Sequence, residues 1–155
     1  MERVSPAAGK IAPVEKTVRV TLPVESAFEL FTSGIASWWP YHTHSVGGQQ
    51  VESCVLEGQV GGRIYEVNKD GSQADWGRVL VWEPPHRLVF SWHPGREADS
   101  AQQVSVQFTA TSQGTQVDLV HTGWELLGEQ AAALRESYVS GWDYVLGKYV
   151  VRAFE

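Results

Sequence analysis

The stretch GEQAAALRESYVSGWDYVLGKYVVRAFE, residues 128–155, decides the fold that we expect for the chain. Its large apolar side chains recur at spacings of four, four, three and four residues, namely Leu134, Tyr138, Trp142, Val145 and Tyr149. Residues three or four positions apart lie on the same face of an α-helix. The stretch therefore predicts a long amphipathic helix of about 26 residues, roughly 39 Å in length, that needs a partner surface for its apolar face.

The residues before this helix begin with a strand and two short helices. VEKTVRVTL (14–22) alternates apolar and polar residues, which is typical of a half-buried strand. Helices are indicated in PVESAFELFT (23–32), where proline suits the first turn, and in GIASWW (34–39), which ends at Pro40.

Six further strand-like runs separate these helices from the C-terminal one. They are QQVESCVLEG (49–58), GGRIYEVNKDG (61–71), ADWGRVLVWEPP (74–85), HRLVFSWHPG (86–95), QQVSVQFTATSQG (102–114) and TQVDLVHTGW (115–124). The breaks between them are short, which suits antiparallel pairing, because parallel pairing needs long crossovers. We expect an α+β fold: a curved antiparallel sheet of about seven strands wrapped around the long C-terminal helix, with two short helices after the first strand.

Length and composition fit a single folded domain. The chain has 155 residues, of which 43% are hydrophobic and 19% charged, and it contains 7 tryptophans. We expect residues 1–13 to form a flexible N-terminal arm and residues 14–155 to form the domain. The single cysteine, Cys54, lies in an apolar strand pattern and is predicted to be buried rather than reactive.

Charge and hydropathy argue against several kinds of partner. The formal net charge is −6, and the 12 basic residues are scattered, so the chain offers no footprint for nucleic acid. It shows neither the apolar core of a signal peptide nor a run of about 18 apolar residues that would insert into a membrane. A cytoplasmic location is the expectation. If the chain associates with itself, a two-fold homodimer is the form we expect.

The order of elements and several local stretches resemble a known family. These stretches are PVESAFELFT, WWP (38–40), EGQVGGRIYE (57–66), WGRVLVWEPPHRLVFSW (76–92), HTGWE (121–125) and GWDYVL (141–146). They resemble single-domain members of the activator of heat-shock-protein ATPase homologue family, within the steroidogenic-acute-regulatory-transfer-like (SRPBCC) superfamily. The resemblance implies a helix-grip fold with a cavity between sheet and long helix, which the superfamily uses to hold apolar or amphipathic small molecules. The co-chaperone that names the family carries a separate N-terminal domain, for which we expect no room in this chain.

The segment WWPYHTHS, residues 38–45, is expected to close one end of the cavity. Its residues Trp38, Trp39 and Tyr41 either pack on the core beneath the short helix, or one or two of them line the mouth of the cavity. In the second case Trp39 is predicted to be an anchor and Tyr41 the residue most exposed to a ligand. Two histidines follow, but His42 and His44 would need His121 from the last strand to make a zinc site. We expect no metal and no cofactor, with His121 instead a buried polar group facing the core.

Other candidate ligand-binding residues come from the strands and the long helix: Tyr65, Arg78, Phe90, Trp92, Phe108, His121, Tyr138 and Trp142. For Tyr65 and Arg78 this holds only if the strand register turns them inward. Otherwise most of Arg63, Glu66, Arg78 and Glu57 are expected to form cross-strand ion pairs on the solvated face. Gly141 lies in the middle of the predicted helix, where glycine is unfavourable, and so indicates close packing, a kink or room for a ligand.

Three functions remain open from the sequence. The first is binding of a small hydrophobic or amphipathic molecule without catalysis, because no standard catalytic motif is present and we assign no catalytic residue. The second is a cyclase-like or dehydratase-like enzyme that uses His121 with Tyr65 or Arg78 in the same cavity. The third is a module that contacts a chaperone, which would need an apolar outer patch rather than a cavity.

Overall fold

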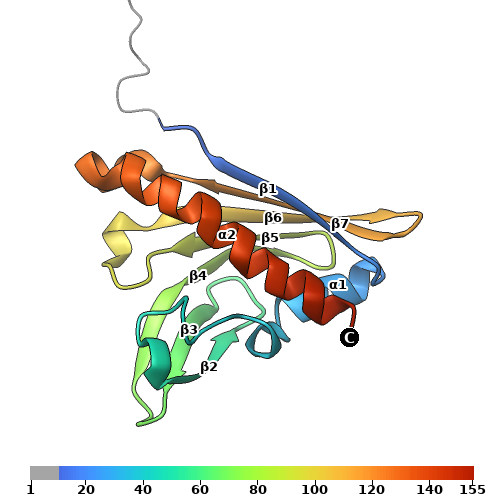
Figure 1. The fold of residues 1–155 in the computed structure, drawn as a ribbon, viewed down its shortest axis with the longest axis horizontal. Helices are drawn as coiled ribbons and strands as arrows, with labels where there is room; N and C mark the ends of the chain where they lie inside the picture. Colours follow the sequence, from blue (N-terminus) through green and yellow to red (C-terminus); the bar gives the residue numbers. More distant parts are fainter. Residues whose placement is uncertain (1–10) are drawn as a thin grey trace, which may run out of the picture.

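A computed structural model describes residues 11–155 and confirms the predicted α+β architecture (Figure 1). In chain order the elements are β1 (Val14–Val20), α1 (Val24–Phe31), η2 (Ile35–Ser37), η3 (Gly48–Gln50), β2 (Val51–Leu56), β3 (Arg63–Asn68), β4 (Gln73–Glu83), β5 (Arg87–Trp92), η4 (Ala98–Ser100), β6 (Gln102–Thr111), β7 (Gly114–Thr122), η5 (Trp124–Gln130) and α2 (Ala131–Ala153). The predicted N-terminal arm, residues 1–13, falls mostly outside the described residues and stays a prediction.

The seven strands form one antiparallel sheet in the order β1-β7-β6-β5-β4-β3-β2. Figure 1 shows the sheet curling from β1 and β7 down to β2, with α2 lying across it. This is the helix-grip arrangement. Among the helices of residues 11–155, none combines the length and the hydropathy that a membrane crossing requires.

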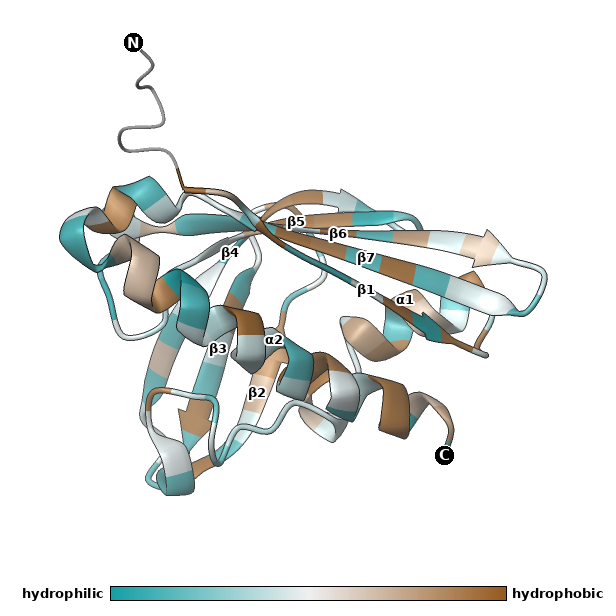
Figure 2. Ribbon diagram, turned by 45° about the horizontal axis from the view of Figure 1, so that its top comes forward, coloured by the Kyte–Doolittle hydropathy of each residue, from teal (hydrophilic) through white to brown (hydrophobic). Residues whose placement is uncertain are grey.

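The core lies between α2 and the inner face of the sheet. On β6 the predicted alternation is confirmed, since Val104, Val106 and Phe108 are buried and the residues between them are more exposed. Figure 2 shows the same alternation of apolar and polar residues along the strands and along α2. Tyr149 of α2 is fully buried, and its hydroxyl donates a hydrogen bond to the Ala27 carbonyl oxygen at 2.8 Å. That bond fixes the C-terminal half of α2 against α1.

The long helix begins three residues later than the sequence predicts. Gly128 has φ 62° and ψ −130°, which is not a helical conformation, so the chain turns there before α2 starts at Ala131. A left-handed φ of this kind is accessible to glycine at little cost. The residues before the turn form η5, whose Trp124 is completely buried.

Candidate functional site

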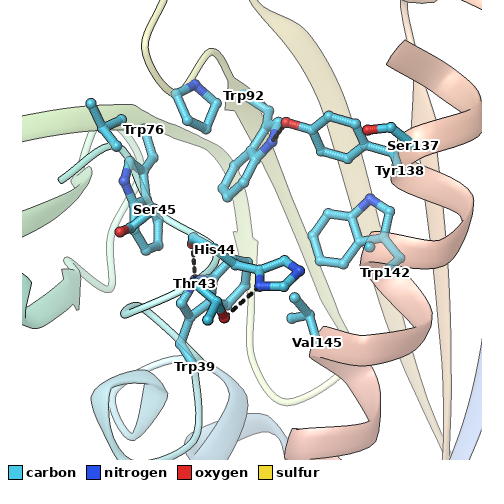
Figure 3. Close-up of a pocket in the computed structure, with 13 residues that line it drawn as sticks. Trp39, Thr43, His44, Ser45, Trp76, Trp92, Ser137, Tyr138, Trp142 and Val145 are labelled. Carbon is cyan, nitrogen blue, oxygen red and sulfur yellow. Dashed lines mark hydrogen bonds between the residues drawn. The ribbon is translucent and has the colours of Figure 1, made fainter. Parts of the chain in front are cut away.

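A pocket of about 330 Å³ lies where α2 crosses the sheet and is closed on a third side by the loop after η2 (Figure 3). We call it the tryptophan pocket. Its lining residues are Trp39, Thr43, His44, Ser45, Val46, Trp76, Trp92, Pro94, Ser137, Tyr138, Gly141, Trp142 and Val145. No Asp, Glu, Lys or Arg side chain of residues 11–155 belongs to this lining, and His44 is its one imidazole.

Four tryptophans from four segments form the apolar wall. Trp39 lies at the centre, with its ring centroid 5.1 Å from that of Trp76, 5.8 Å from Trp92 and 6.0 Å from Trp142. All four indoles are at least 93% buried in the folded chain. Tilted and edge-on contacts at these distances are favourable for aromatic rings and hold them in place. The wall is therefore largely formed before any ligand arrives.

The two adjacent tryptophans of the WWPYHTHS segment have different roles. Trp38 packs against Phe31 and Tyr149 in the core, and its Nε1 donates to the Leu30 carbonyl oxygen at 2.8 Å. Trp39 faces the pocket, and its Nε1 donates to the His44 carbonyl oxygen at 2.8 Å. The second bond ties the start of the loop to its middle.

The structure places Tyr41 outside the tryptophan pocket, although the sequence led us to expect it there. Tyr41 lies in a separate shallow depression that also includes Pro40 and Lys148, with its ring edge-on to His42. The reason is the turn after Pro40, in which the backbone amide of His44 donates to the Pro40 carbonyl oxygen at 2.9 Å. The turn carries Tyr41 away and places His44 at the pocket rim.

A buried carboxylate holds the loop in position. Glu66 of β3 is fully buried, and its oxygens accept hydrogen bonds from the backbone amides of Val46 at 2.8 Å and Gly47 at 2.7 Å. The same carboxylate accepts from Nε1 of Trp76 at 2.6 Å. Glu66 therefore links the loop to a tryptophan of the pocket wall, and the solvated ion pair that we expected for it is wrong.

The other charged residues of this region lie on the outer face of the sheet. Arg63 pairs with Asp75 at 2.7 Å, as an exposed cross-strand ion pair, and its guanidinium lies 4.1 Å from the Tyr65 ring centroid. Arg78 is exposed and donates to the Gly61 carbonyl oxygen. Tyr65 and Arg78 are thus not turned inward. Among residues 11–155 Glu57 has no ion-pair partner, and its carboxylate accepts from the backbone amide of Arg63 instead.

Two polar side chains of the pocket, those of Tyr138 and His44, can form one more hydrogen bond each than they form with residues 11–155. The Tyr138 hydroxyl accepts a hydrogen bond from Nε1 of Trp92 at 3.1 Å. His44 is stacked on Tyr144 with a centroid distance of 4.8 Å and an angle of 14°, and its Nδ1 lies 2.8 Å from the Thr43 hydroxyl. Burial lowers the pKa of His44 below its usual value of 6.5, so the imidazole is neutral at pH 7.

His121 is buried behind the pocket rather than in its wall. Its Nδ1 accepts a hydrogen bond from Nε1 of Trp142 at 3.0 Å, and its ring lies 4.2 Å from that of Trp124. Burial, assisted by the positive charge of Arg96, lowers the pKa of His121 to about 3. Its Nε2 is buried and has no hydrogen-bond partner among residues 11–155. The histidine acts as a neutral support for Trp142.

Of the other candidates, the structure brings Trp39, Trp92, Tyr138 and Trp142 into the pocket lining. Phe90 and Phe108 are buried elsewhere in the core, with Phe108 packed edge-on against Phe28 at 5.1 Å. Within residues 11–155, no three His, Cys, Asp or Glu side chains gather as metal ligands would. Cys54 is buried, and burial together with the negative charge of Glu66 raises its pKa to about 12, so it is not a nucleophile.

Gly141 supplies part of the space in the pocket. A Cβ placed on this residue would have no atom within 4 Å, apart from those of its own helical turn. The open space beside Gly141 argues against close packing as the reason for this glycine, and room for a ligand stays a prediction. His44 and Trp76 are the main pocket residues that the sequence did not reveal.

Comparison with known proteins supports the same fold. The family model described as Activator of Hsp90 ATPase homolog 1-like protein matches residues 21–150. No curated protein matches the chain. Among solved structures, an anthrahydroquino-gamma-pyrone synthase, Txn09, complexed with SUM, is 35% identical with a TM-score of 0.58, over 81% of this chain and 85% of that one.

Two further structures are similar in fold alone. A Bacillus halodurans protein solved in solution is 21% identical with a TM-score of 0.68, over 94% of this chain and 99% of its own. The Aha1 dimer from Colwellia psychrerythraea is 16% identical with a TM-score of 0.62, over 90% of this chain and 94% of that one.

Proposed function

The chain belongs to the family of Activator of Hsp90 ATPase homolog 1-like proteins, and we propose that it binds a small, uncharged, aromatic molecule in the tryptophan pocket. The observation that carries this proposal is a preformed aromatic wall around empty space. Binding sites for small molecules are usually concave, mostly apolar and provided with a few polar groups, and the tryptophan pocket has each of these features.

The size of the pocket limits the ligand. A cavity of roughly 150 Å³ holds benzene. The tryptophan pocket, at about 330 Å³, has room for a molecule of two or three fused rings. Flat rings suit it, because they can pack against the indoles of Trp39, Trp92 and Trp142.

The absence of charge in the lining argues for a neutral ligand. Transfer of an ion from water into an apolar site is costly unless a partner charge compensates it. Among residues 11–155 no Asp, Glu, Lys or Arg side chain lines the pocket, and burial lowers the pKa of the lining residue His44, so its imidazole adds no positive charge at pH 7. The buried carboxylate of Glu66 behind Trp76 further disfavours anions.

Titration with naphthalene, followed by quenching of tryptophan fluorescence, tests this function. Gly141→Phe places a ring in the open space of the pocket, and we expect it to weaken naphthalene binding by at least about tenfold. Gly147→Phe is the matched control, because Gly147 also lies in α2 with open space around it but does not line the pocket. Equal affinities of the two variants, or failure of the wild type to bind naphthalene, would overturn the proposal.

The 35% identity to a pyrone synthase favours a second candidate, a synthase that acts on an aromatic substrate held in the same pocket. Incubation of the protein with the substrate of Txn09, followed by mass spectrometry, would reveal product formation. A product that forms with the wild type and with Gly147→Phe, but not with Gly141→Phe, would establish the enzyme. If the wild type forms no product, this candidate is excluded, and the binding function stands on the naphthalene titration.

A further inference from the structure

We propose that the tryptophan pocket selects aromatic molecules that carry a hydroxyl and a carbonyl group: Nε2 of His44 accepts the hydrogen bond of the hydroxyl, and the Tyr138 hydroxyl donates to the carbonyl. The inference rests on the proposed function and names the polar groups of its ligand. His44 comes from the loop and Tyr138 from α2, so the two contacts arise from different walls of the pocket (Figure 3).

The hydrogen bonds of Thr43 assign the tautomer of His44. The Thr43 hydroxyl lies 3.2 Å from the Pro40 carbonyl oxygen and 2.8 Å from Nδ1 of His44. A hydroxyl has one proton to donate, and a carbonyl oxygen can only accept. Both contacts are therefore satisfied together only when Thr43 donates to Pro40 and Nδ1 of His44 donates to Thr43.

In that tautomer the other ring nitrogen is an acceptor. A neutral imidazole with its proton on Nδ1 carries a lone pair on Nε2. The structure gives Nε2 of His44 no hydrogen-bond partner among residues 11–155, and it is not among the fully buried unpaired atoms. The stacking of His44 on Tyr144 fixes the plane of the ring, so the free nitrogen has a defined direction at the rim. A ligand hydroxyl is the group that such an acceptor selects.

Tyr138 offers the opposite polarity. The indole N–H of Trp92 can only donate, so the Tyr138 oxygen is the acceptor in the bond between them. The hydroxyl proton of Tyr138 remains, and it meets no acceptor among residues 11–155. A carbonyl oxygen on the ligand would accept a hydrogen bond from this proton. A second ligand hydroxyl could accept it only with its oxygen turned toward Tyr138.

Four related compounds separate these contributions when their dissociation constants are measured by tryptophan fluorescence: naphthalene, 2-naphthol, 2-acetylnaphthalene and 2-naphthoate. Since a hydrogen bond contributes about 0.5–1.5 kcal/mol net, replacement of His44 by Phe should lower the affinity for 2-naphthol relative to that for naphthalene by about threefold to tenfold. Tyr138→Phe should weaken 2-acetylnaphthalene binding to the same extent. His86→Phe is the control, because His86 is exposed and does not line the pocket.

The outcomes distinguish this inference from the proposed function. If the wild type binds naphthalene but His44→Phe lowers the affinities for naphthalene and 2-naphthol equally, the role of His44 is refuted. A loss of 2-acetylnaphthalene binding in His44→Phe would assign the opposite tautomer and also overturn the inference. Binding of 2-naphthoate more tightly than 2-naphthol would refute selection of neutral ligands. His44→Gln retains an acceptor and should keep part of the 2-naphthol affinity, which excludes a misfolded loop as the cause. If none of the compounds binds, the proposed function fails, and this inference fails with it.

Discussion

Replacement of Glu66 by Gln is the sharpest test of how the loop is held over the pocket. The carboxylate accepts three hydrogen bonds: Oε1 from Trp76 Nε1 and the Val46 amide, and Oε2 from the Gly47 amide. All three partners are donors. Glutamine has only one oxygen, so in either orientation its NH₂ group would face at least one N–H group.

The expected loss follows from these contacts. In the better orientation the glutamine oxygen keeps the bonds to Trp76 and Val46, and the amide of Gly47 is left facing another donor. Loss of one hydrogen bond to a charged group costs about 1.5–3 kcal/mol, and the two remaining bonds weaken when the charge is removed. We therefore expect Glu66→Gln to lower the free energy of unfolding by at least about 2 kcal/mol.

Urea denaturation followed by far-UV circular dichroism measures this change, and hydrogen exchange at the amides of Val46 and Gly47 locates it. Both amides should exchange faster in Glu66→Gln. Glu57→Gln is the control, because Glu57 accepts a single bond, from the Arg63 amide, that a glutamine oxygen can retain. A loss of less than about 0.5 kcal/mol in Glu66→Gln, with unchanged exchange at Gly47, would refute the role of Glu66 as the anchor of the loop.

Three further predictions concern the long helix and its support. Trp142→Phe removes the donor to Nδ1 of His121 and should lower the free energy of unfolding by about 1–3 kcal/mol. The same change in a His121→Leu background should lower it by less, and urea denaturation of the wild type, the two single variants and the double variant measures the difference. In the folded chain His121 becomes protonated only near pH 3, because burial lowers its pKa, whereas in the unfolded chain it becomes protonated below about pH 6.5. Below pH 6.5 the unfolded chain therefore binds more protons, and the free energy of unfolding should fall by up to about 1.4 kcal/mol for each pH unit. Between about pH 5 and 6.5, where most carboxylates stay ionised, His121→Gln should reduce this slope, and an unchanged slope would exclude His121 as its source. Gly147→Ala and Gly141→Ala should each raise the free energy of unfolding by about 0.5–1 kcal/mol, since both positions are helical with open space beside them, and only Gly141→Ala should also weaken naphthalene binding.

The sequence predicts the fold well because the fold depends on periodic patterns. The alternation in β6 buries one face as expected. On the predicted face of α2, Trp142, Val145 and Tyr149 are buried, whereas Leu134 and Tyr138 toward its start are only partly buried. The predicted start of α2 is three residues too early, because Gly128 has a positive φ and does not continue the helix. Glycine adopts positive and negative φ with similar ease, so the sequence alone does not predict this value.

The candidate site is only partly predictable, because its polar contacts join segments far apart in the chain. Glu66 lies two residues after the buried Ile64 and so on the same face of β3, but glutamate is rarely buried, and a sequence pattern alone therefore assigns it to the solvated face. Its backbone donors are the amides of Val46 and Gly47, twenty and nineteen residues earlier, and no local sequence pattern predicts these contacts. His44 entered the pocket instead of Tyr41 because of a backbone turn, which depends on the hydrogen bonds after Pro40 rather than on residue type.

The two open glycines of α2 show why the empty space in the pocket is more than imperfect packing. Protein interiors are close-packed, and a side chain at Gly141 could fill the space while also favouring the helix. Gly147 has the same helical cost, so glycine alone does not indicate a site. What differs is the surroundings: Gly147 is exposed and lies outside the pocket, whereas Gly141 lines the pocket together with the four tryptophans. Under the proposed function, a bound aromatic molecule would pack against these indoles, and Gly141→Ala, but not Gly147→Ala, would then weaken naphthalene binding.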